Sequence, residues 1–125
     1  MSKVNVRYIV DNVDAAIAFY TEYLGFEVDI HPAPGFAALS YGNLQLYLNQ
    51  PGAGGAGKAT TDGQQPQPGG WNRIQIVVED IEATVASLED AGARFRNDIV
   101  TGNGGKQVLL EDPAGNPIEL FQPAQ

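Results

Sequence analysis

The sequence contains two related copies of one pattern, and this repetition is the strongest constraint on its fold. The segment 12–17 (NVDAAI) is similar to the segment 80–85 (DIEATV), which begins 68 residues further along the chain. Each copy follows a short β-branched run and leads to a glycine, Gly25 or Gly92. Two copies of one unit usually pack about a pseudo-twofold axis, with a pocket where they meet. We therefore expect two modules that line one pocket together.

Each copy predicts the order β-α-β-β-β, which makes the fold class α+β with two tandem βαβββ modules. Alternating residues predict a first strand at 4–10 and its counterpart at 74–78. Asn12 and Asp80 are suitable N-caps for the helices that follow. The predicted apolar stripes of the two helices are Val13, Ile17, Tyr20 and Leu24, and then Ile81, Val85 and Leu88. The remaining strands are predicted at 26–30, 36–41 and 44–48, and at 94–100, 106–111 and 118–121.

These boundaries give one domain, 1–125, with a first module at 3–50 and a second at 71–123. The segment 51–70 between them is rich in Gly, Pro, Gln and Thr and has no apolar periodicity. Such a segment buries too little apolar surface to fold alone, which predicts a flexible linker. The alternative is a lid over a pocket.

Composition narrows the classes of partner and the compartment. The chain has no cysteine, and its 7 basic and 15 acidic residues give a net charge of −8. This balance argues against nucleic acid and anionic membranes as partners. No apolar run reaches the ~20 residues of a membrane span, and no secretion signal is visible. We therefore expect a cytoplasmic protein.

The predicted helix 12–20 (NVDAAIAFY) is followed by the exit 23–26 (YLGF), and the C-terminal segment 111–120 reads EDPAGNPIEL. These two motifs resemble the vicinal oxygen chelate superfamily of glyoxalases, bleomycin resistance proteins and extradiol dioxygenases. The resemblance implies a curved-sheet cup that holds a small organic molecule. It also implies a divalent metal, with ligands from the first and last strands of each module.

The residues at those implied ligand positions are unsuited to a metal. They are Asn5, Arg73, Glu119 and, depending on the strand register, Tyr47 or Gln45. An arginine has no lone pair to donate, and Asn and Tyr are poor ligands beside His and carboxylates. His31 falls in a predicted His-Pro-Ala-Pro-Gly turn, where it is expected to be solvated. We therefore expect no metal and no other cofactor.

A polar face on the strands offers a different kind of site. The period of two places Asn5, Arg7, Arg73 and Gln75 on one face, with Gln45, Tyr47 and Asn49 beside them. Most of this face, together with Trp71 and Glu119, forms the set of candidate ligand-binding residues. The set is Asn5, Arg7, Gln45, Tyr47, Trp71, Arg73, Gln75 and Glu119. Trp71 is either a wall on which a flat ligand stacks or a hydrophobic plug. Phe36 is a weaker candidate of the same kind and is expected in the core.

An ion pair between Arg73 and Glu119 is expected, in a forked geometry across the cup. It would serve either as a polar anchor on the floor of the pocket or only as a structural pair.

Three functions remain open from the sequence. The preferred one is a metal-free small-molecule-binding homodimer whose ligand carries a carboxylate or carbonyl group. The second is a lyase, isomerase or dioxygenase with an atypical metal site at Glu119, or with Glu119 as a general base. The third is a structural domain without a ligand, in which Arg73 and Glu119 affect stability alone.

Overall fold

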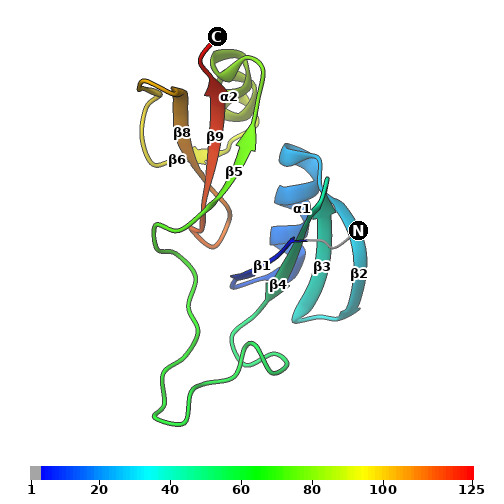
Figure 1. The fold of residues 1–125 in the computed structure, drawn as a ribbon. Helices are drawn as coiled ribbons and strands as arrows, with labels where there is room; N and C mark the ends of the chain where they lie inside the picture. Colours follow the sequence, from blue (N-terminus) through cyan, green and yellow to red (C-terminus); the bar gives the residue numbers. More distant parts are fainter. Residues whose placement is uncertain (1–3) are drawn as a thin grey trace. The chain divides into compact units, whose positions relative to one another are not determined.

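Two structural units, each built on the predicted βαβββ path, make up residues 4–125, which the computed structural model describes (Figure 1). The first unit extends to Gly69 and the second begins at Gly70. The α+β fold with two tandem modules is therefore confirmed. No helix within these residues is long and apolar enough to cross a membrane.

The first unit is a four-stranded sheet with one helix on one face. Its elements are β1 (Val4–Ile9), α1 (Val13–Leu24), β2 (Glu27–Ala33), β3 (Phe36–Tyr41) and β4 (Leu44–Asn49). The strand order is β1-β4-β3-β2. β1 runs parallel to β4, and the other pairs are antiparallel.

The second unit repeats this path with its first strand after the helix broken in two. Its elements are β5 (Ile74–Val77), α2 (Ile81–Asp90), β6 (Arg94–Phe95), β7 (Val100–Thr101), β8 (Gly105–Glu111) and β9 (Pro117–Pro123). The order is β5-β9-β8-β6, and β7 also pairs with β8. β5 runs parallel to β9, as β1 does to β4.

Both helices begin in the same way, which confirms the predicted N-caps. The side chains of Asn12 and Asp80 each accept a hydrogen bond from the backbone N–H three residues later, at 3.0 and 3.1 Å. The start of each helix also has a second side-chain acceptor, which was not visible in the sequence. Gln50 follows β4, and Gln122 is the next-to-last residue of β9. The side chain of each accepts a hydrogen bond from the first N–H of the helix in its own module, at 3.0 and 2.8 Å. Each last strand is thereby tied to its own helix.

The core of each unit lies between the sheet and its helix. In the first unit Val13, Ala16, Phe19 and Tyr20 of α1 are buried. The predicted stripe is therefore rotated slightly, because Ile17 and Leu24 are only half-buried. The sheet contributes alternate residues such as Leu46 and Leu48, and the second unit does the same with Ile76, Ile118 and Leu120. Burying one such aliphatic side chain stabilises the fold by about 1.5–3 kcal/mol.

The predicted strand at 94–100 is wrong, because the chain leaves the sheet between β6 and β7. At this break the N–H of Arg96 donates to the carbonyl of Leu109 at 2.9 Å. The side-chain oxygen of Asn97 accepts from the N–H of Leu109, also at 2.9 Å. A side chain has thus taken the place of a backbone group in the ladder, and regular pairing stops.

The predicted turn at 31–35 starts later than expected, because β2 continues to Ala33 and only Pro34 and Gly35 form the turn. His31 is exposed, as expected. β2 is an edge strand, where a proline such as Pro32 costs no ladder hydrogen bond. His31 Nε2 lies 3.8 Å from the Asp14 carboxylate of α1.

Candidate functional site

A closed cluster of Arg73, Gln75 and Glu119 lies on the sheet of the second unit. The parallel register places Gln75 opposite Glu119. Oε1 of Glu119 accepts from Nε and Nη2 of Arg73 at 3.0 and 2.8 Å. Oε2 accepts from Nε2 of Gln75 at 2.7 Å. Glu119 is only 8% exposed, and these three donors take three of the roughly four lone-pair sites of its carboxylate.

The ion pair expected between Arg73 and Glu119 is therefore confirmed, but its geometry differs from the expectation. Both guanidinium donors reach one oxygen, so the pair is not forked. Arg73 precedes β5, and β5 is the neighbour of β9, so the pair joins adjacent strands of one sheet. The second oxygen accepts from Gln75 instead of from the guanidinium.

The backbone of Trp71, rather than its ring, contacts this cluster. Its carbonyl accepts from Nη1 of Arg73 at 3.2 Å. Trp71 is 68% exposed, so it does not plug the edge of its sheet. The guanidinium of Arg96 lies 4.8 Å from the ring centroid, in a cation–π contact. One face of the indole is thus occupied by a cation.

The contacts of Arg96 could not be predicted from the sequence, because Arg96 lies in the segment predicted as a regular strand. Its Nε pairs with Glu111 at 2.7 Å, and its Nη1 donates to the carbonyl of Gly70 at 2.7 Å. Its Nη2 donates to the carbonyl of Gly115 at 2.8 Å. Arg96 therefore connects the start of the second unit to the turn between β8 and β9.

That turn contains the C-terminal signature, and its residues are structural here. Asp112 is fully buried. Its Oδ1 accepts from the N–H groups of Ala114 and Asn116, both at 2.9 Å, and its Oδ2 accepts from Nδ2 of Asn116 at 3.0 Å. Such a turn needs Asp and Asn at these positions whatever the function of the protein.

The strand register of the first unit identifies the counterpart of Glu119. Arg7 lies opposite Tyr47, and Asn5 lies opposite Gln45. Gln75 is the repeat equivalent of Arg7, since they are 68 residues apart. Tyr47, rather than Gln45, therefore occupies the position of Glu119.

The polar face of the first unit forms a different network from the cluster of the second. The Arg7 guanidinium lies 4.9 Å from the centroid of the Tyr47 ring. The Tyr47 hydroxyl donates to Oε1 of Gln45 at 3.3 Å, and Nε2 of Gln45 donates to Asp29 at 2.9 Å. Asn5 is exposed at the start of β1. Within residues 4–125, Arg7 forms no ion pair with a carboxylate.

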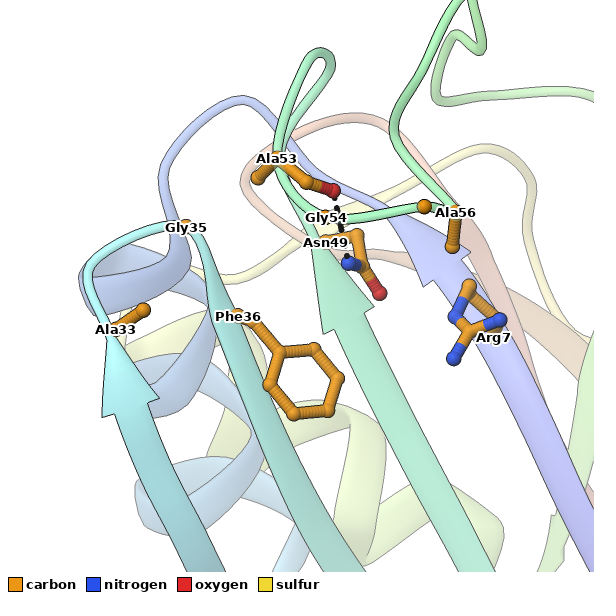
Figure 2. A pocket seen from close by; sticks show the side chains of 9 residues that line it. Arg7, Ala33, Gly35, Phe36, Asn49, Ala53, Gly54 and Ala56 are labelled. Carbon is orange, nitrogen blue, oxygen red and sulfur yellow. Dashed lines mark hydrogen bonds between the residues drawn. The ribbon is translucent and has the colours of Figure 1, made fainter.

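A pocket of about 330 Å³ lies within the first unit, at one end of this polar face (Figure 2). The strands β1, β3 and β4 contribute Arg7, Phe36 and Asn49. The loop 53–56 forms one wall, and Ala33 and Gly35 complete the lining. The volume is at the lower end of the ~300–1,000 Å³ found for ligand pockets.

Asn49 has an unusual position in this pocket. It is only 3% exposed, and its Nδ2 donates to the carbonyl of Ala53 at 3.3 Å. Its Oδ1 is buried and has no hydrogen-bond donor among the described residues. In Figure 2 this oxygen points away from Ala53, toward the side of the pocket where Phe36 and Arg7 lie. A buried acceptor without a donor costs about 1–3 kcal/mol, so a donor on a bound molecule would be stabilising here.

The loop that walls the pocket depends on glycine for close backbone approach. Gly57 donates to the carbonyl of Ala53 at 3.0 Å, and a Cβ on Gly57 would lie 2.5 Å from that oxygen. A Cβ on Gly35 would lie 2.6 Å from the Cβ of Ala53. The stretch 51–57 therefore has a specific fold of its own, while flexibility of the whole segment 51–70 stays a prediction.

The sequence signal for this pocket was only partial. The period of two predicts Asn49 on the polar face but does not distinguish it as a binding residue. Phe36 was expected in the core, and it is half-buried in the pocket wall. The glycine-rich loop looked like a linker, because composition does not show which glycines permit close packing.

The residues at the implied metal positions do not fit a metal. Arg73 is a cation, Asn5 and Tyr47 are weak donors, and the Glu119 carboxylate is occupied by Arg73 and Gln75. Across the described range 4–125, no three His, Cys, Asp or Glu side chains come together as a ligand set. No step of a mechanism through a metal follows from this arrangement.

Comparison with known proteins identifies the family. Residues 4–120 match the family Glyoxalase, described as the Glyoxalase/Bleomycin resistance protein/Dioxygenase superfamily. The chain belongs to this superfamily. No curated protein sequence matches it significantly.

Solved structures of the superfamily share the fold at low identity. A lactoylglutathione lyase from Agrobacterium tumefaciens is 20% identical, with a TM-score of 0.76 over 97% of this chain and 92% of that one. TnmS3, an antibiotic binding protein from Streptomyces sp. CB03234, is 24% identical, with a TM-score of 0.75 over 99% and 98%. A superfamily member from Sphaerobacter thermophilus is 24% identical, with a TM-score of 0.76 over 98% and 97%. At such identity, these similarities extend to the fold alone.

Proposed function

We propose that this chain is a metal-free small-molecule-binding protein of the glyoxalase/bleomycin resistance type. The observation that carries the proposal is the closed cluster of Arg73, Gln75 and Glu119. Three of the roughly four lone-pair sites of the Glu119 carboxylate accept hydrogen bonds from Arg73 and Gln75, and its negative charge is already paired with a guanidinium. A metal ion would also have to approach a guanidinium at close range, which is electrostatically unfavourable.

The pocket of the first unit supports ligand binding as the remaining role of the polar face. It combines apolar walls with a small number of polar groups, which is the usual composition of a ligand pocket. Among the described residues, the Arg7 guanidinium has no carboxylate partner and the Asn49 amide oxygen has no hydrogen-bond donor. A ligand could supply both. The proposal is supported by a protein of the same fold, TnmS3, which is described as an antibiotic binding protein.

The proposal is tested by isothermal titration with the protein in EDTA. The panel contains cationic drugs, neutral aromatics and small organic acids. We expect at least one class to bind, with an affinity that added Zn²⁺, Ni²⁺, Fe²⁺ or Mn²⁺ leaves unchanged. Binding that appears only with a metal would support a metal-dependent enzyme instead. Absence of binding across the panel, with and without metal, would support a purely structural domain.

A homodimer is part of the same proposal, because a ligand site in this superfamily forms within one chain or across two. Size-exclusion chromatography with light scattering measures the mass directly. A mass of two chains is expected, and a monomer at every concentration would remove the dimer from the account.

A further inference from the structure

We propose that the pocket lined by Arg7, Phe36 and Asn49 selects a small organic acid that has a neutral N–H or O–H donor close to its carboxylate. This inference rests on the proposed binding function and specifies its ligand class. Three separate features of the pocket lead to it: an unpaired cation, an unpaired acceptor and an apolar wall.

The cation is Arg7, and its situation differs from that of Arg73 in the second unit. Arg73 is neutralised by Glu119, whereas Arg7 has a tyrosine ring at the equivalent place. A guanidinium against an aromatic ring keeps its N–H edge available for another group. Guanidinium groups bind carboxylates strongly and with defined geometry. Arg7 therefore favours an anionic ligand group, even though the chain carries a net charge of −8.

The acceptor is Oδ1 of Asn49, and its orientation is determined by its other atom. Nδ2 donates to the carbonyl of Ala53, so exchanging the two amide atoms would place two acceptors against each other. The oxygen must therefore point away from Ala53, as Figure 2 shows. A ligand with only acceptors leaves this buried oxygen unpaired, whereas a hydroxyl or amide N–H can donate to it.

The remaining lining limits the rest of the ligand. Phe36 supplies a ring, and Ala33, Ala53 and Ala56 supply methyl groups without any charged group. The volume of about 330 Å³ suits a compact apolar group. A cationic amine is disfavoured, because Arg7 is the charged residue of the lining and would repel it.

The selectivity is tested with a set of matched compounds by isothermal titration. Phenyllactate has the carboxylate, the neighbouring hydroxyl and a ring. Phenylpropionate lacks the hydroxyl, and methyl phenyllactate lacks the charge. We expect phenyllactate to bind about tenfold more tightly than either compound, since one hydrogen bond to a buried or charged group contributes roughly this factor.

Variants assign each preference to its residue. In Arg7→Gln the advantage of phenyllactate over its methyl ester should disappear, while its advantage over phenylpropionate remains. In Asn49→Leu the advantage of phenyllactate over phenylpropionate should disappear, while its advantage over the methyl ester remains. Arg94→Gln is the matched control, because Arg94 is an exposed arginine of the second unit outside the pocket lining, and it should change neither ratio.

Circular dichroism verifies that each variant is folded, and the comparison of compounds on the unaltered chain holds even if Asn49→Leu does not fold. Equal affinities for the three compounds, or tighter binding of a cationic drug, would overturn this inference and leave the proposed binding function intact. Binding of no compound in either panel would overturn both.

Discussion

Replacing Arg73 by methionine tests whether the closed cluster stabilises the second unit as the structure implies. The variant keeps a long apolar side chain but removes both guanidinium bonds to Glu119. The carboxylate stays on a face where its side chain is 10% exposed, with Gln75 as its remaining donor. Breaking a fully buried pair costs about 3–5 kcal/mol, and an exposed pair is worth about 0–1 kcal/mol. The Arg73 side chain is 29% exposed, so we expect an intermediate loss of about 2 kcal/mol.

Urea unfolding followed by tryptophan fluorescence measures this loss. Trp71 is the single tryptophan of the chain and lies two residues from Arg73 in the second unit, so the signal reports on that unit. The double variant Arg73→Met with Glu119→Met is the control, because it removes the uncompensated charge together with its partner. We expect the double variant to recover most of the lost stability. An unchanged midpoint in Arg73→Met, or additive losses in the double variant, would refute the reasoning.

Three further predictions concern other parts of the fold. Gly57→Ala should open the loop that walls the pocket and weaken ligand binding about tenfold or more, because its Cβ would overlap backbone atoms; titration with the best ligand of the panel measures this. Gln122→Leu should lower the free energy of unfolding by about 1 kcal/mol, since the first N–H of α2 loses its acceptor; urea unfolding measures it, with an unchanged midpoint as the contrary result. The Thr60 hydroxyl donates to Asp62 and holds the pKa of that carboxyl below its usual range. The turn should therefore be stabilised at neutral pH and lose this contribution as the pH falls through the lowered pKa. In Thr60→Val an NMR titration should show the pKa of Asp62 rising, and an unaltered ordinary value in both proteins would indicate a flexible segment.

The fold was predictable because its signals are local and occur twice. The caps at Asn12 and Asp80, the period-two strands and the β-α-β-β-β order all follow from neighbouring residues. The split of the predicted strand 94–100 was not predictable in the same way. It depends on Asn97 replacing a backbone acceptor across the sheet, which is a tertiary contact.

The candidate site shows the same difference between features that follow from local sequence and features that depend on tertiary contacts. The pairing of Arg73 with Glu119 followed from the strand positions that the family resemblance implies and from opposite charge. The role of Asn49 did not, because its side chain bonds to the loop after β4 and lines a pocket with that loop, which is a tertiary arrangement. That loop packs through close glycine contacts, and a glycine-rich stretch has the same composition whether it is ordered or free.

Metal content tests the central claim most directly. The protein is expressed in medium that contains Mn, Fe, Ni and Zn, purified without chelator and analysed by plasma mass spectrometry. We predict a metal content far below one ion per chain, equal in the unaltered protein and in Glu119→Gln. A near-stoichiometric transition metal that is lost in Glu119→Gln would show that Arg73 and Gln75 release this carboxylate to a cation, which contradicts the account.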